Sequence, residues 1–441
     1  MRTSQPSQIS FAMGTAEAVS WRLLSICGLC IETELTDMAV SAPAYPDSLS
    51  IRSVLPSRSA AGQTRSIAVL PSKHIPTLDS LRGVAILLVL LRHSVAGAET
   101  TSKLWSSLLV PLRLTWSGVD LFFVLSGFLI GGILLDARHS PRYFRTFYIR
   151  RAFRILPMYY VFLGLYFVRR LGIHLVPGVL GDASPMPIPL LSFVTFTQNF
   201  WMASFGWFGA WGIAATWSLA VEEQFYLTVP FLIRNVSTRR LYAVLGCIII
   251  AAPILRAVLP HLMEHGDFAN YVLTPCRADA LSMGVVAALL YRNPGFKIWL
   301  KRNTWVLYSV LLLTFVGILY LTGWAWEQYT PPMATWGLSC LALFYTCMLL
   351  SVVCQLNPIA EGVLRLKPLM KLGTVAYCTY LVHPVLMQAA RTLLRSHLRS
   401  SPAVVWPLGG LLGIGASLVV AYVSWTFFER PLVRYGHEFP Y

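Results

Sequence analysis

The main pattern along the chain is a series of long apolar stretches separated by short, polar and mostly basic loops. The longer stretches reach the ~20 residues that an α-helix needs to cross a bilayer, and the shorter ones approach that length. The pattern predicts an all-α fold, a polytopic integral membrane helical bundle with about ten transmembrane helices. The expected spans are residues 79–98, 117–135, 155–168, 215–233, 241–259, 278–291, 306–321, 335–353, 372–394 and 404–428.

The second of these stretches contains small residues in pairs, Ser126-Gly127 and Gly131-Gly132. Small side chains let two helix backbones approach each other closely in lipid. We therefore expect this span to pack tightly against a neighbouring helix.

Composition agrees with a membrane protein and argues against a nucleic-acid-binding one. The chain is 56% hydrophobic and 12% charged, with a mean hydropathy of +0.61; soluble domains are roughly 25% charged. The net charge of +16 comes largely from arginines in the loops, as the positive-inside rule predicts. Membrane lipids are thus expected partners, and nucleic acid is not. Cys27 and Cys30 form a lone CxxC without a second ligand pair, so no metal is expected.

Three parts are expected along the chain. Residues 1–72 are polar and rich in Ser, Pro and Ala, and we interpret them as a disordered extension or the product of a mis-assigned start codon. Residues 73–435 contain the membrane domain. Residues 436–441 form a short tail that we expect on the cytoplasmic side.

Loop charges predict the orientation of the spans. The stretch 188–201 is short, and counting it as a span would put two basic loops outside, against the positive-inside rule. We therefore predict that it is re-entrant or interfacial, which leaves ten spans with both termini cytoplasmic in a plasma (inner) membrane. One exception remains, because Arg391, Arg395 and Arg399 then fall near the outer face.

The first span carries two ionisable residues on one face. His93 follows Arg82 by eleven residues, and eleven steps of about 100° return to within ~20° of the starting direction. The two are then separated by about 16 Å along the axis. An ionisable group deep in lipid usually faces a polar cavity and marks a functional site. The alternative is a core histidine that donates to a backbone carbonyl.

Seven motifs occur in order between residues 75 and 435. They are Arg82 with His93, Gly118 to Phe128, Arg151-Ala152-Phe153-Arg154, Trp217 to Tyr226, Arg277 to Leu281, Tyr380 to Pro384, and Phe428-Glu429-Arg430-Pro431. In this order they resemble the motifs of the membrane-bound acyltransferase family 3. The resemblance implies transfer of an acyl group, often acetyl, from cytosolic acyl-CoA (acetyl-CoA) to a hydroxyl of a carbohydrate, a lipid-linked glycan or another cell-envelope acceptor.

The resemblance also implies roles for particular residues. His93 would take the proton of the acceptor hydroxyl, and Glu222 or Asp120 would orient its ring, with Glu223 as a further carboxylate. For Glu222 and Glu223 the alternative is an ion pair inside the bundle. Arg82, Arg151 and Arg154 would bind the donor's phosphates, although positive-inside topology explains the last two equally well. Further candidates, which could equally form a structural polar network, are Ser126, Arg277, Asp279, Tyr380 and His383.

The competing function is a proton-coupled transporter of a small anionic solute, because buried ionisable groups among ten spans suit that class too. The sequence contains neither an inverted repeat nor a matched pair of broken helices. If the chain is an acyltransferase, we expect 188–201 and the Trp-rich stretch after it to roof an acceptor cavity near Glu222. Trp201, Trp207 and Trp211 would then stack on sugars or anchor the interface. The acceptor's identity and the oligomeric state are left open by the sequence.

Overall fold

The computed structural model describes residues 75–95, 114–170, 188–322, 330–397 and 402–441. Within these ranges all regular structure is helical, in agreement with the all-α prediction. The elements up to α12 are α2 (Pro76–Val95), η1 (Leu114–Ser117), α5 (Gly118–Asp136), α6 (Tyr143–Arg170), α7 (Leu190–Val194), α8 (Gln198–Phe205), α9 (Trp211–Ala214), α10 (Thr216–Asn235), α11 (Thr238–Leu262) and α12 (Gly266–Val272). They are followed by α13 (Thr274–Arg292), α14 (Pro294–Arg302), α15 (Thr304–Leu321), η2 (Met333–Gly337), α16 (Leu338–Val353), α17 (Pro358–Leu364), α18 (Lys367–Thr374), α19 (Ala376–His397), α20 (Pro402–Ser424), η3 (Trp425–Glu429) and α21 (Arg430–His437).

Six helical segments of the described chain are long and apolar enough to cross a membrane. They are Leu114–Asp136, Thr238–Leu262, Gly266–Arg292, Thr304–Leu321, Met333–Val353 and Val404–His437. The other four expected spans coincide with α2, α6, α10 and α19, which have 20, 28, 20 and 22 residues. Charged side chains within these four helices lower their hydropathy. The total of about ten spans therefore stays a prediction.

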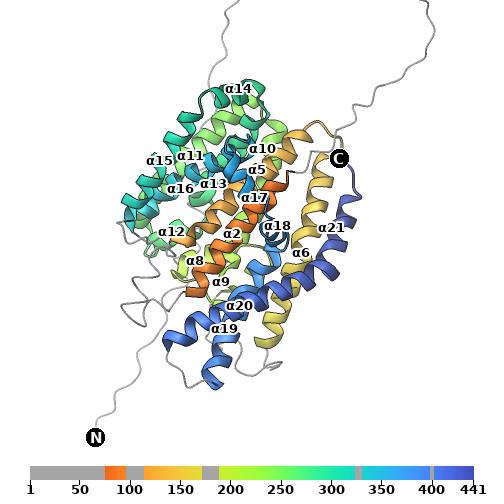
Figure 1. The fold of residues 1–441 in the computed structure, drawn as a ribbon, viewed down its shortest axis with the longest axis vertical. Helices are drawn as coiled ribbons and strands as arrows, with labels where there is room; N and C mark the ends of the chain where they lie inside the picture. Colours follow the sequence, from red (N-terminus) through yellow and green to blue (C-terminus); the bar gives the residue numbers. More distant parts are fainter. Residues whose placement is uncertain (1–74, 96–113, 171–187, 323–329, 398–401) are drawn as a thin grey trace, which may run out of the picture. The chain divides into compact units, whose positions relative to one another are not determined.

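The small residues of α5 produce the close contact that was expected of this helix. Gly127 lies against Gly284 of α13, and a Cβ at either position would overlap main-chain oxygens of the other helix, those of Leu281 and Val124. The same device joins α2 to α18, where a Cβ at Gly83 or Gly373 would overlap the opposite backbone. These contacts hold α5 beside α13 and α2 beside α18 (Figure 1).

The stretch 188–201 does not form one continuous helix. α7 has 5 residues and α8 has 8, and Phe196 between them has a positive φ of 55°. At 1.5 Å per residue these helices are about 8 and 12 Å long, against a hydrocarbon core of about 30 Å. Gln198 is fully buried and donates to the Thr216 carbonyl at 2.9 Å, which ties α8 to α10. Re-entrance of this stretch stays a prediction.

The C-terminal residues pack on α6. Arg150 donates to the carbonyls of Phe439 (2.8 Å) and His437 (3.3 Å), and Thr146 donates to the carbonyl of Pro440 at 2.7 Å. α21 accordingly lies along α6 in Figure 1. The predicted 1–72 extension, with Cys27 and Cys30, lies outside the described residues.

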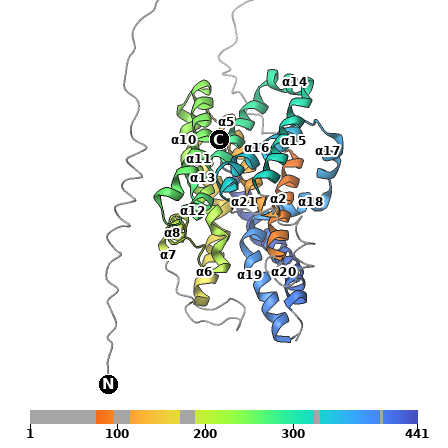
Figure 2. The same cartoon turned by 90° about the vertical axis from the view of Figure 1, so that its left-hand side faces the viewer.

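Arg391, which the predicted topology places near the outer face, is buried. It is 2% exposed in α19, and its guanidinium donates to the carbonyls of His93 (2.8 Å) and Ser94 (3.0 Å) at the end of α2. The last carbonyls of a helix have no partner within the helix, and a cation near them is favourable. Arg391 therefore caps α2, next to α20, which pairs with α19 in Figure 2. Of the other two arginines, Arg395 lies over the Trp406 ring and Arg399 is outside the described residues.

Candidate active site

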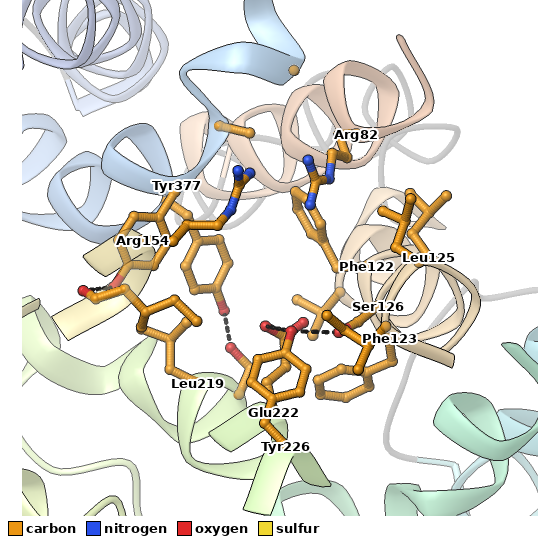
Figure 3. A pocket seen from close by; sticks show the side chains of 18 of the residues that line it. Arg82, Phe122, Phe123, Leu125, Ser126, Arg154, Leu219, Glu222, Tyr226 and Tyr377 are labelled. Atoms are coloured by element: carbon orange, nitrogen blue, oxygen red, sulfur yellow. Dashed lines mark hydrogen bonds between the residues drawn. The ribbon is translucent and has the colours of Figure 1, made fainter. Parts of the chain in front are cut away.

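A cavity lies among α2, α5, α6, α10 and the α18–α19 junction. The cavity has a volume of about 110 Å³. Many of its apolar wall residues come from α5, and its polar groups, apart from Ser126 of α5, come from the other helices (Figure 3). Candidate residues from five of the seven sequence motifs, including that of α2, line the cavity. The sequence did not specify that these motifs would meet.

Three arginines supply positive charge to this cavity. Arg82 comes from α2, while Arg151 and Arg154 are one turn apart on α6, and Figure 3 shows Arg82 and Arg154 extending into the same space. Arg82 lies 3.9 Å from the carboxylate of Asp79. In the described part of the chain, neither Arg151 nor Arg154 forms an ion pair. Such a cluster favours an anion, and the planar donor groups of arginine suit phosphate.

A short hydrogen-bonded series of side chains forms the opposite wall. The Tyr226 hydroxyl donates to Glu222 Oε2 at 3.2 Å, so the Ser126 hydroxyl, 2.5 Å away, donates to the Tyr226 oxygen. Arg151 lies 5.8 Å above the Tyr226 ring. Glu222 therefore lines the same cavity as the three arginines, whereas Glu223 is not among the cavity-lining residues.

His93 lies beyond the end of this cavity. Its Nδ1 is 2.9 Å from the carbonyl of Val89, and because a carbonyl only accepts, the Nδ1 carries the hydrogen. The ring packs edge-on against His383, with centroids 4.8 Å apart, and against Trp211 at 5.9 Å. Because Nδ1 is bonded to Val89, Nε2 is the ring nitrogen of this partly buried side chain that is available for proton transfer.

Tyr380 connects the cavity with the two histidines. It lines the cavity, its ring centroid is 5.8 Å from that of His383, and its hydroxyl is 2.6 Å from the Ser218 hydroxyl. The order of side chains is thus cavity, Tyr380, His383, His93 and Trp211. The partly exposed Trp211 is the one of the three candidate tryptophans that contacts His93, whereas Trp201 stacks on Phe205.

The remaining acidic candidates lie in a separate buried network. Asp120 forms an ion pair with Arg277, and both are at most 1% exposed. The rings of Phe123 and Tyr271 lie 5.4 and 5.3 Å from the Arg277 guanidinium carbon, within cation–π range. Asp279 accepts from Arg256 at 2.9 Å and from Ser339 at 2.5 Å.

The two carboxylates expected as partners of His93 have other partners in the structure. Asp120 faces α13 and binds Arg277, and Glu222 accepts from Tyr226. Among the described residues, no hydrogen bond joins either carboxylate to His93, whose Nδ1 is instead bonded to its own helix. Arg277 and Asp279 each form a buried ion pair, with Asp120 and Arg256 respectively, which is consistent with the structural polar network that the sequence left open for these two residues.

Two arginines were missed as site neighbours by the sequence analysis. Arg391 caps the helix end that carries His93, and Arg256 completes the pair with Asp279. The available signal was the same for both: an arginine inside an otherwise apolar stretch, which requires a buried partner. In the described part of the chain, no three His, Cys, Asp or Glu side chains gather in a way that could hold a metal ion.

Comparison with known proteins identifies the family. The sequence model described as an acyltransferase domain matches residues 75–426. The chain belongs to this acyltransferase family. It is thus an integral membrane enzyme of the class that transfers acyl groups other than aminoacyl groups.

Curated relatives are enzymes of O-acetylation. The peptidoglycan O-acetyltransferase OatA of Listeria monocytogenes is 27% identical over 385 residues, covering 82% of this chain and 56% of the relative. YrhL of Bacillus subtilis, described provisionally as a peptidoglycan O-acetyltransferase, is 28% identical over 395 residues with the same coverage. The O-acetyltransferase OatA of Staphylococcus aureus is 23% identical and covers 83% and 58%. The chain spans a little over half the length of these relatives, and no solved structure matches it.

Proposed function

We propose that this membrane acyltransferase moves an acyl group, most simply acetyl, from a cytosolic acyl-CoA to a hydroxyl of a cell-envelope carbohydrate. The observation that carries the proposal is the cluster of Arg82, Arg151 and Arg154 in one cavity that adjoins the His383–His93 pair. The donor carries several phosphates, and the three guanidinium groups supply matching charge. The relatives named for peptidoglycan O-acetylation support a glycan acceptor.

The residues divide the reaction between two places. The arginines bind the donor's phosphates, and the apolar wall of α5 accommodates its uncharged arm. His93, about 16 Å further along α2, takes the proton of the acceptor hydroxyl at Nε2 as the oxygen attacks the thioester carbon. The carbon–sulfur bond then breaks, and the proton passes to the leaving thiolate. Trp211, beside His93 and partly exposed, forms one wall of the acceptor's site.

The central test replaces His93. General-base catalysis typically contributes ~10²–10⁴-fold in rate, so His93→Ala should lower acyl-CoA consumption by that factor in the presence of a glycan acceptor. The donor affinity should be unchanged, because the arginines remain. Purified protein that elutes as a single folded species and retains near wild-type turnover would remove His93 from the mechanism.

The orientation is a separate part of the proposal. The N-terminal end of α6 and the C-terminal ends of α10 and α13 would face the cytoplasm, because cytoplasmic loops carry the excess of arginine and lysine. The helix α8 would face the outside. Single cysteines in place of Phe205 and Val236 should react with a membrane-impermeant thiol reagent from opposite sides, position 205 from outside. Reaction of both from one side would mean that residues 188–201 cross the membrane.

A further inference from the structure

His383 has a buried nitrogen without a partner. The side chain is fully buried in α19, and its Nδ1 lies 2.8 Å from the Tyr380 carbonyl, so Nδ1 carries the hydrogen. The Nε2 atom is therefore a hydrogen-bond acceptor, and among the described residues no donor reaches it. Buried acceptors are nearly always satisfied, and an exception calls for an explanation.

The ring that packs against His383 is that of His93. The ring centroids are 4.8 Å apart with an interplanar angle of 68°. His93 also has its hydrogen on Nδ1, which is bonded to Val89. As neutral groups the two rings each present an Nε2 lone pair, and two acceptors cannot hydrogen-bond to each other. A hydrogen bond between the two Nε2 atoms requires a second proton on one of the rings.

We propose that His383 is a positioning residue that accepts a hydrogen bond from His93 Nε2–H after His93 has taken the acceptor's proton. This inference rests on the proposed function, in which the oxygen–acyl bond forms, the carbon–sulfur bond breaks and the proton travels from the hydroxyl through His93 to the leaving thiolate. His383 gains and loses no proton in the cycle. It stabilises the charged imidazolium at the moment when it exists.

A neutral partner has an advantage over a carboxylate at this place. A carboxylate would bind the protonated form of His93 before the substrate arrives, and that form cannot act as a base. A neutral imidazole acceptor provides a charge-assisted bond only after proton transfer. The two acidic candidates are engaged elsewhere, since Asp120 binds Arg277 and Glu222 accepts from Tyr226. In this proposal the partner of charged His93 is a second imidazole and not a carboxylate.

Two substitutions of His383 separate this role from a structural one. In His383→Asn the amide N–H can replace Nδ1–H toward Tyr380, but nothing replaces Nε2. In His383→Gln the side-chain oxygen reaches the Nε2 position, whereas the Nδ1 donor is lost. We expect His383→Asn to lower kcat by about 10- to 150-fold, the worth of one hydrogen bond to a charged group, with both KM values little changed. His383→Gln should recover most of that loss.

The same substitution in a His93→Ala background provides the control. If His383 acts through His93, His383→Asn should cause no further loss of the residual activity there. The inference would be overturned if the Asn and Gln variants lost equal activity, or if the Asn variant were the more active of the two. It would also be overturned by a change confined to KM, or by an additive loss in the His93→Ala background. Each rate is referred to the folded fraction measured by size-exclusion chromatography.

The outcome is distinguishable from failure of the proposed function. An active His93→Ala variant overturns the proposed function itself. An inactive His93→Ala variant beside a fully active His383→Asn variant leaves the proposed function in place and removes His383 alone.

Discussion

The arginines of α11 and α13 and those of α6 belong to the same bundle, yet their surroundings differ. Arg256 and Arg277 are at most 1% exposed, and each faces an aspartate, Asp279 or Asp120. Arg151 and Arg154 line a cavity and have no such partner among the described residues. In a membrane a buried charge needs a counter-charge or a polar cavity. Arg256 and Arg277 have a counter-charge inside the protein. Arg151 and Arg154 instead face the cavity, whose walls include polar groups.

The largest expected effect comes from breaking the Asp120–Arg277 pair. Asp120→Ala leaves a fully buried guanidinium without its counter-charge. We expect this variant to lower the free energy of unfolding by about 3–5 kcal/mol, the typical cost of breaking a buried ion pair. Thermal denaturation of the detergent-purified protein measures it. The matched control is Glu222→Ala, which removes only the acceptor of one Tyr226 hydrogen bond and should cost about 0.5–1.5 kcal/mol. Equal loss in both variants would contradict a structural role specific to Asp120.

The next effect is on donor binding and concerns the unpaired set. Arg154→Ala should weaken binding of the acyl-CoA by about 10- to 150-fold, because a charge-assisted bond contributes about 1.5–3 kcal/mol. Stability should not fall, since no ion pair is broken. Arg154→Lys should restore part of the affinity, because lysine keeps the charge and lacks the fork. Calorimetric titration with the donor measures both, and unchanged donor affinity in Arg151→Ala and Arg154→Ala would leave membrane topology as their role.

The smallest effect sharpens the comparison within one helix. Arg150 precedes Arg151 directly, but it donates to the carbonyls of Phe439 and His437. Arg150→Ala should leave donor affinity unchanged and lower the free energy of unfolding by about 1–2 kcal/mol, the net contribution of a small set of hydrogen bonds. The same titration and denaturation experiments apply. A loss of donor affinity equal to that of Arg154→Ala would show that charge density alone, and not position, determines binding.

Much of the architecture followed from the sequence. The period and length of the apolar stretches predicted the helices, since every backbone group in lipid must be bonded within its own helix. The small residues of the second stretch predicted its tight packing, which Gly127 and Gly284 provide. The alignment of Arg82 and His93 on one face follows from the helix repeat alone. The ordered motifs also indicated the acyltransferase family, to which the chain belongs.

Only the tertiary structure decided how the charges are matched. Asp120 and Arg277 are 157 residues apart in the chain, and Arg391 is 298 residues from the carbonyl of His93 that it binds. A sequence contains each charge but not its partner, because any carboxylate attracts any guanidinium and the choice depends on which helix faces meet. Packing therefore gave Asp120 to Arg277 and placed His383 against His93. It left Arg151 and Arg154 at the cavity, where no carboxylate of the described residues forms an ion pair with either guanidinium.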